Sequence, residues 1–188
     1  MVTLFVAELT DKDALLILAL ATRTRPLRIF LAGASAFFIT TALFVSLGSL
    51  AAVVVPILWI KLAGGSVMIA YGLWEARGLI GRKVIEEDEG VIEKARGGVR
   101  AFLLTVGALA TLDMAGDATE VLTIVFVAQY SNFLLVFTAT YLGLVGATAV
   151  ETALGNRLGK ILSPRRVRFV SMTVFLLLGA SIITLSLV

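Results

Sequence analysis

The chain has 188 residues, of which 59% are hydrophobic and 15% are charged, with a formal net charge of +3. A soluble domain is typically about 45–50% apolar. A chain with a mean hydropathy of +1.02 cannot hide so much apolar surface in a core of its own, and we expect it to lie in lipid. The absence of cysteine and histidine excludes disulfides, thiolate or imidazole metal ligands, cysteine nucleophiles and Ser-His-Asp catalysis.

Six apolar runs are each long enough to cross a bilayer as a helix, which takes about 20 residues. The expected spans cover residues 3–22, 27–54, 59–79, 101–127, 133–154 and 168–188. Pro26, Pro56 and Tyr130-Ser131-Asn132 mark turns between them. The first run has no basic start and is interrupted by acidic residues, so we interpret it as a retained span rather than a signal peptide. The sequence therefore predicts an all-α integral membrane protein.

Residues 81–100 form the one long polar stretch, and their positive and negative charges balance. We interpret this stretch as a charged cytoplasmic loop that separates a first three-helix unit, 1–80, from a second, 101–188. All of the 16 basic residues except Lys12 and Lys61 lie in or beside the first, third and fifth loops. The positive-inside rule places these loops in the cytoplasm and both termini outside. The high isoelectric point is thus a signal of topology, not of nucleic-acid binding.

The second half of the chain echoes the first at an offset of 106–107 residues. The matched pairs are Asp11 with Asp117, Leu47-Gly48 with Leu154-Gly155, Gly72 with Gly179, and Phe30 with Phe137. Because each half has three spans, the two halves must have opposite orientations in the membrane. Such inverted repeats are typical of secondary transporters, which bind their substrate between the repeats near the midplane.

Two charged clusters interrupt the apolar runs, although a charge at the bilayer centre costs at least about 2.5–3.5 kcal/mol. In the first, Glu8 and Asp11 share a helix face and Glu8 can pair with Lys12, while Asp13 points roughly the other way. A simple Glu8–Lys12 ion pair, with Asp13 as a further partner of Lys12, is the alternative to a functional site.

The second cluster consists of Asp113, Asp117 and Glu120, which follow an i, i+4, i+7 pattern. On one continuous helix this pattern predicts a narrow stripe of three carboxylates with no basic residue to balance them. Asp113 can also be read as a supporting residue rather than a ligand. Glu151, less than two turns before Arg157, is interpreted as an interfacial residue or part of a cytoplasmic vestibule, and only weakly as a ligand.

Five inward-facing carboxylates against one lysine suit a hard divalent cation, because calcium, magnesium and manganese take oxygen ligands. Crowded carboxylates also bind protons readily, so the same groups can exchange protons for a metal. From the residues alone, the prediction is a transporter with a polar core, selective for a cation.

With these two charged clusters, the chain resembles the Gdt family of membrane cation/proton exchangers. That family includes Golgi manganese and calcium transporters and bacterial manganese exporters. The resemblance covers essentially the whole chain, including Arg25-Pro26-Leu27 and the glycines Gly72 and Gly179. Members of that family have two three-helix repeats, each with a Glu-x-Gly-Asp-Lys/Arg-Thr/Ser motif in its first helix.

Both copies of the motif depart from the family pattern. The first keeps Glu8, Asp11 and Lys12 but has Thr10 and Asp13 in place of the glycine and the hydroxyl residue. The second keeps three residues, Gly116, Asp117 and Thr119. In that copy Met114 stands at the glutamate position and Ala118 at the basic one, so either Asp113 or Glu120 is expected to replace the missing carboxylate.

The resemblance implies exchange of manganese or calcium for protons, with export of the cation from the cytoplasm and no permanent cofactor. The implied ligands are Glu8, Asp11, Asp117 and Glu120, completed by Thr10, Thr119 and backbone carbonyls, with Asp113 as a further candidate and Lys12 and Asp13 balancing charge. The alternatives are a transporter of a basic amino acid or other organic cation, and a membrane scaffold or assembly factor that transports nothing. The sequence does not decide which ion is preferred, how many protons are exchanged, or whether the chain forms a homodimer.

Overall fold

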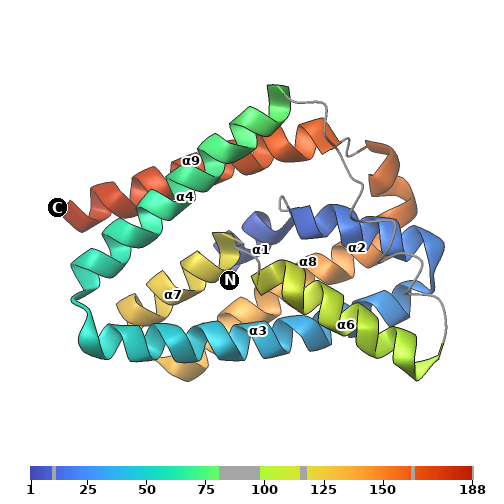
Figure 1. Cartoon of the computed structure of the whole chain (residues 1–188), viewed down its shortest axis with the longest axis horizontal. Helices are drawn as coiled ribbons and strands as arrows, with labels where there is room; N and C mark the ends of the chain where they lie inside the picture. The colour runs from blue at the N-terminus through green and yellow to red at the C-terminus, as the bar shows by residue number, and fades with distance from the viewer. Residues whose placement is uncertain (10–11, 81–97, 115–117, 162–163, 188) are drawn as a thin grey trace.

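The computed structural model describes residues 1–9, 12–80, 98–114, 118–161 and 164–187 (Figure 1). These residues form eight helices and no strand. The helices are α1 (Val2–Leu9), α2 (Lys12–Arg23), α3 (Pro26–Val54), α4 (Ile57–Ile80), α6 (Val99–Met114), α7 (Ala118–Tyr130), α8 (Phe133–Ile161) and α9 (Pro164–Leu187).

Three expected turns are confirmed, and each has a local cause. Pro26 is the first residue of α3, where a missing N–H costs nothing and the fixed φ suits a helix. Pro56 separates α3 from α4. Between α7 and α8, Ser131 takes a positive φ of 50°, and the Asn132 side chain caps α8 by accepting a hydrogen bond from the Leu135 N–H at 3.0 Å.

Four helices are long and apolar enough to cross a membrane: Pro26–Val54, Ile57–Arg77, Phe133–Gly155 and Phe169–Leu187. A fifth span is possible if α6 and α7 count as one, although they are bent by 68°. The continuous helix expected over residues 101–127 is therefore wrong. Within the first expected span the structure describes α1 and α2, of 8 and 12 residues, on either side of residues 10–11, which lie outside the described residues. The protein is thus a multi-pass membrane protein, while the count of six spans stays a prediction.

The order of elements repeats along the chain. In each half, two short helices precede a helix of 29 residues and then one of 24 residues: α3 and α4 in the first half, α8 and α9 in the second. The matching lengths agree with a repeat, and its inverted orientation stays a prediction.

The two 24-residue helices, α4 and α9, lie side by side (Figure 1). A Cβ at Gly179 would lie 2.7 Å from the Gly65 carbonyl oxygen and 3.1 Å from the Ile69 nitrogen. A Cβ at Gly65 would lie 2.9 Å from the Gly179 carbonyl oxygen. Small residues let the two backbones approach, as in many membrane helix pairs.

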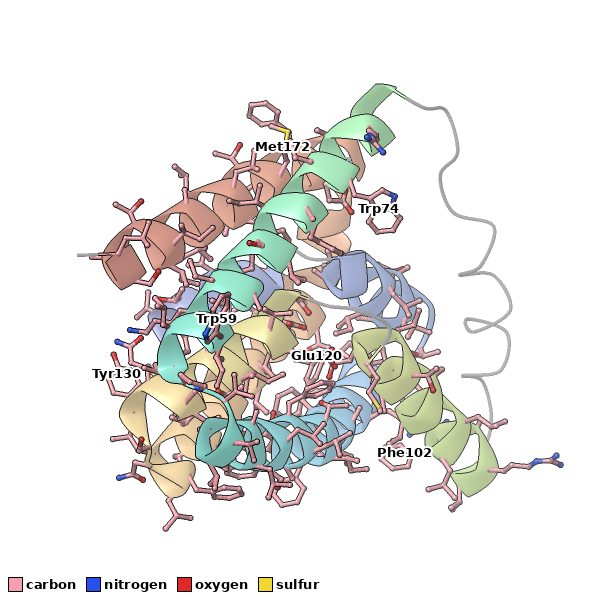
Figure 2. All side chains as sticks on the ribbon, turned by 60° about the vertical axis from the view of Figure 1, so that its left-hand side comes forward. Trp59, Trp74, Phe102, Glu120, Tyr130 and Met172 are labelled. Carbon is pink, nitrogen blue, oxygen red and sulfur yellow. The ribbon has the colours of Figure 1, made fainter. Side chains whose placement is uncertain are left out.

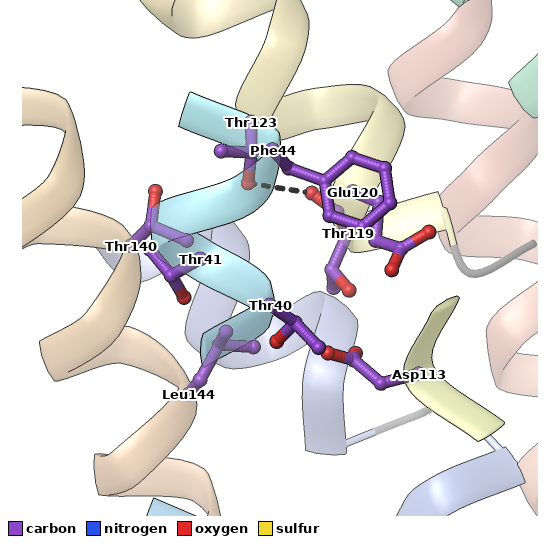
Figure 3. Close-up of a pocket in the computed structure, with 9 residues that line it drawn as sticks. All are labelled: Thr40, Thr41, Phe44, Asp113, Thr119, Glu120, Thr123, Thr140 and Leu144. Atoms are coloured by element: carbon purple, nitrogen blue, oxygen red, sulfur yellow. Dashed lines mark hydrogen bonds between the residues drawn. The ribbon is translucent and has the colours of Figure 1, made fainter. Parts of the chain in front are cut away.

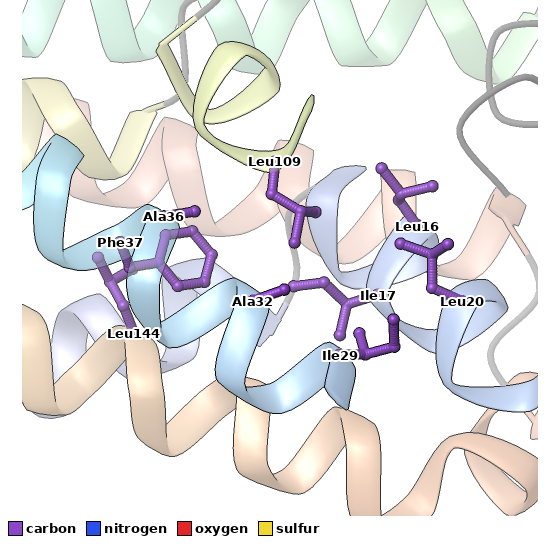
Figure 4. Packing of buried hydrophobic residues seen from close by; sticks show 9 residues of the cluster. All are labelled: Leu16, Ile17, Leu20, Ile29, Ala32, Ala36, Phe37, Leu109 and Leu144. Atoms are coloured by element: carbon purple, nitrogen blue, oxygen red, sulfur yellow. The ribbon is translucent and has the colours of Figure 1, made fainter. Parts of the chain in front are cut away.

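The largest apolar cluster fills the space between α2, α3, α6 and α8 (Figure 4). Its buried members are Leu16, Ile17, Leu20, Ile29, Ala32, Ala36, Phe37, Leu109 and Leu144. A second cluster joins α1 to the α4–α9 pair and α7 through Leu4, Ala7, Met68, Leu122 and Phe175. One face of the short helix α1 is thus buried against the protein, while Val2 and Val6 on it are exposed.

Much of the outer surface is apolar, as expected for a protein in contact with lipid. Val53, Val54 and Leu134 are 84%, 82% and 73% exposed. Trp59 and Trp74, near opposite ends of α4, are also exposed and project from the surface (Figure 2). Aromatic residues with this placement are typical of the membrane–water interface.

The α4–α9 contact leads to a prediction for Gly179→Ala. The added methyl group meets backbone atoms that cannot move aside, so we expect a loss of about 1–3 kcal/mol of stability, measured as a lower midpoint of denaturation in detergent. The control is Gly107→Ala in α6, which has no atom within 4 Å of the new Cβ and should be neutral or slightly stabilising. Equal midpoints for the two variants would show that the close crossing does not limit stability.

Candidate functional site

A pocket lies where α3, α6, α7 and α8 meet, near the middle of the long helices (Figure 3). It is polar for a site among membrane helices, and the described part of its lining includes two carboxylates and five threonines. The described lining residues are Thr40, Thr41 and Phe44 from α3, Asp113 from α6, Thr119, Glu120 and Thr123 from α7, and Thr140 and Leu144 from α8.

The two carboxylates reach the pocket from the ends of two helices. Asp113 is the penultimate residue of α6, and Glu120 lies in the first turn of α7. The 68° bend between these helices corrects the prediction of a straight stripe of three carboxylates. The bent pair has the form of a broken span or a re-entrant loop, and secondary transporters use broken helices to bind ions near the midplane.

The helix ends contribute to the electrostatics of the pocket. The first turn of α7 carries partial positive charge, which favours the acidic Glu120. The last turn of α6 carries partial negative charge beside Asp113. A cation at this end of α6 would therefore be attracted by the helix as well as by the carboxylates.

All these polar residues are buried. Asp113 and Thr119 are each 1% exposed and Glu120 is 7% exposed. Figure 3 shows the Asp113 side chain extending from the end of α6 toward Thr40. Carboxylates this deeply buried in an apolar protein need a compensating charge or a proton.

Two threonine hydroxyls of the pocket are available to a ligand. Thr123 donates a hydrogen bond to the Thr119 carbonyl at 2.8 Å. The hydroxyls of Thr41 and Thr140, by contrast, are buried without a hydrogen-bond partner among the described residues. Sequence reasoning missed both. The signal was there, because each threonine lies near the centre of an expected apolar span.

The pocket is small. The volume open to the centre of a water-sized sphere is about 10 Å³, roughly what one water molecule needs. A bare metal ion can fit such a space, and an amino acid cannot. The described residues contain no group of three acidic side chains placed to hold a metal, so the pocket provides two carboxylates together with hydroxyl oxygens.

The other predicted residues are distributed as follows. Glu8, in the last turn of α1, is buried but does not line the pocket. Thr10, Asp11 and Asp117 lie outside the described residues, as do the side chains of Lys12 and Asp13. The meeting of the two motif copies, and the Glu8–Lys12 pair, therefore stay predictions.

Two further outcomes concern residues near the second motif. Met114, at the position of the missing glutamate, is 46% exposed and does not line the pocket. Asp113 and Glu120, the two candidates to replace that carboxylate, both do. Glu151 is 1% exposed and is therefore buried within the protein. Its interpretation as an interfacial residue or part of a cytoplasmic vestibule stays a prediction.

Comparison with known families identifies a match over most of the chain. The family model described as "Divalent cation/proton antiporter GDT1" matches residues 1–81 and 101–186. The unmatched segment between them is the charged stretch noted in the sequence. No curated protein and no solved structure matches the chain.

The free hydroxyl of Thr140 leads to a prediction for Thr140→Val, which keeps the shape of the side chain. Removing a buried hydroxyl without a partner should leave stability unchanged or raise it by up to about 1–3 kcal/mol, measured by denaturation in detergent. Binding of a divalent cation should weaken, because Thr140 lines the pocket. The control is Thr148→Val, which removes a hydroxyl bonded to the Leu144 carbonyl at 2.9 Å and outside the pocket lining. The prediction would be contradicted if Thr148→Val weakened cation binding while Thr140→Val left it unchanged.

Proposed function

The chain belongs to the GDT1 family of divalent cation/proton antiporters, and on that premise we propose that it exchanges manganese or calcium for protons and exports the cation from the cytoplasm. As a member of an antiporter family, the protein is a transporter and not an enzyme. The proposal concerns the ion, the direction of transport and the residues of the site.

The observation that carries the proposal is the buried pocket with Asp113 and Glu120 on its wall. Two carboxylates balance the charge of one divalent cation. Carboxylate, hydroxyl and carbonyl oxygens are the ligands that calcium and other hard cations prefer. The hydroxyls of Thr41 and Thr140 extend this oxygen set.

Exchange for protons follows from the cost of leaving such a pocket charged. When the cation departs, two buried carboxylates repel each other and lack the solvation that water gives. Protons neutralise the two carboxylates, and the transporter without its cation can then return to the conformation that faces the other side of the membrane. Binding of a cation and binding of protons then exclude each other, which is the requirement for antiport.

The motif residues complete the proposed site. Glu8, Asp11 and Asp117 are proposed as ligands contributed by the two motif copies, with oxygens of Thr10 and Thr119. Lys12 and Asp13 are proposed to balance charge when the cation is absent. Thr119 supports this reading because it lines the pocket beside Glu120.

The size of the pocket and the family together favour a metal ion over the alternatives. A volume of about 10 Å³ is too small for a basic amino acid. The antiporter family replaces the hypothesis of a scaffold that transports nothing. That the cation is manganese or calcium rests on the family resemblance alone. The oxygen ligands suit both ions and do not distinguish between them.

The proposed direction of export rests on the family resemblance, and the proposed orientation gives which loops face the cytoplasm. The basic loops around residues 23–28, 81–100 and 155–168 are placed in the cytoplasm by the positive-inside rule. A proton gradient directed into the cytoplasm would then drive the cation outward.

We expect Asp113→Asn and Glu120→Gln each to weaken manganese or calcium binding at least about tenfold, because each removes a negative charge that faces the ion. Asp117→Asn tests the motif aspartate in the same way. Binding is measured by calorimetry in detergent, and transport in proteoliposomes with a pH gradient. Glu75→Gln in α4, which does not line the pocket, is the matched control. Unchanged binding in both pocket variants would contradict the proposed site.

Binding should also weaken in acid, because protons compete with the cation for the same carboxylates. If two protons leave for each cation, the apparent Kd should rise by up to about a hundredfold per pH unit in the range where the carboxylates are protonated. The measurement is a binding series at several pH values. A Kd that is independent of pH would rule out direct exchange.

The orientation can be tested by cysteine labelling, because the natural chain contains no cysteine. A membrane-impermeant thiol reagent added to intact cells should label Ser131→Cys and leave Glu87→Cys unlabelled until the membrane is opened. The opposite pattern would place the basic loops outside and contradict the proposed orientation.

A further inference from the structure

Glu151 is a buried acidic side chain of α8 to which the proposed site gives no role. It lies in α8, is 1% exposed, and does not line the pocket. Neither of its carboxyl oxygens has a hydrogen-bond partner among the described residues. An isolated carboxylate is among the most costly groups to bury, so its presence calls for an explanation.

The position of Glu151 follows from the packing of the turns on either side. One turn earlier, Thr148 contacts α3 closely, since a Cβ at Gly33 would lie 2.9 Å from its Cγ2. One turn later, Gly155 packs on α2, where the Ala21 Cβ would lie 3.2 Å from a Cβ at Gly155. Residues three and four apart share a helix face. Glu151 therefore lies on the face of α8 that packs on α2 and α3.

The same face of α8 begins at the pocket. Thr140 and Leu144 line the pocket, and steps of three or four residues lead from them through Thr148 to Glu151. At 1.5 Å per residue, Glu151 is about 10 Å along the axis from Leu144 and about 16 Å from Thr140. It is therefore too far from the pocket to bind the same ion, and it lies toward the end of α8 that leads into the basic loop.

The helices that pack on α8 carry few ionisable groups that bear on Glu151. Those described are Glu8 on α1, Arg28 on α3 and Glu120 on α7. Arg28 is bonded to the carbonyl of Gly98, and Glu120 faces the pocket. Lys12, Asp13 and Arg23 belong to α2, and their side chains lie outside the described residues.

We propose that Glu151 is a second proton-binding site of the exchanger, distinct from the pocket and placed between it and the basic-loop end of α8. This proposal rests on the proposed function of cation/proton exchange. In the buried position described here, the carboxyl group holds its proton, because no described residue compensates the ionised form. When that end of α8 opens to water, the O–H bond breaks, the proton passes to water, and the carboxylate is solvated until a proton returns.

Infrared difference spectroscopy of the full chain in lipid tests the protonation directly. The wild type should show the band of a protonated carboxyl group at neutral pH, which disappears as the pH is raised toward about 9 and is missing in Glu151→Gln. The proposal is overturned if no such band belongs to Glu151 at neutral pH. It is equally overturned if the band persists unchanged from about pH 5 to about pH 9, since Glu151 would then never release its proton.

A transport measurement tests whether this proton takes part in exchange. With the membrane potential held at zero, each proton exchanged allows one pH unit to support a tenfold cation ratio at rest. Glu151→Gln should bind manganese or calcium as tightly as the wild type, yet support a cation ratio about tenfold smaller per pH unit. The same ratio in both proteins would overturn the proposal. Glu75→Gln is the control and should match the wild type.

If Glu151→Gln binds the cation but transports none, Glu151→Asp shows whether transport needs a carboxyl group at this position or the shape of glutamate. Transport restored by this variant, which can still bind a proton, supports the proposal. A variant as inactive as Glu151→Gln overturns it, because the position would then need the shape of glutamate rather than its proton. If the wild type itself exchanges no cation for protons, the proposed function fails, whereas the infrared result still shows whether Glu151 binds and releases a proton.

Discussion

Ionised groups are costly in hydrocarbon, and much of this molecule is arranged to keep its acidic residues away from lipid. Four of the described ones are at most 7% exposed: Glu8, Asp113, Glu120 and Glu151. The outer surface is left to side chains such as Val53 and Leu134. Each buried acid then needs a cation or a proton, and this need connects the fold to exchange.

The bend between α6 and α7 is how the fold meets that need at the pocket. A straight helix would have carried Asp113 and Glu120 on one stripe along its side. Two helices at 68° instead direct their ends into the space beside α3 and α8. Helix ends also carry partial charges and backbone groups without helical partners. The break therefore supplies polarity at the depth where apolar side chains would otherwise fill the protein.

The sequence predicted the elements whose cause is local. Pro26, Pro56 and Asn132 mark helix boundaries through their own backbone chemistry, and the long apolar runs of α3, α4, α8 and α9 have no competing interpretation. It failed where tertiary contacts decide. The apolar pattern continues through residues 101–127, so periodicity predicted one helix where the packing forms two. Glu151 was interpreted from its distance to Arg157 along the sequence, and that distance could not show that its side chain is buried within the protein. The sequence analysis recognised Asp113 and Glu120 because a charge within a membrane helix is energetically costly. It missed Thr41 and Thr140 because threonine is common in membrane helices.

The volume of the pocket has a consequence for selectivity that does not depend on ligand type. With room for about one water molecule, an ion can occupy the site only after it has lost nearly all of its hydration shell. Magnesium sheds water more reluctantly than calcium and prefers sites that let it keep several waters. In a cell where magnesium is a competing dication, the cost of dehydration alone would then disfavour it at the proposed site. The carboxylates and hydroxyls of that site would otherwise accept magnesium, calcium and manganese.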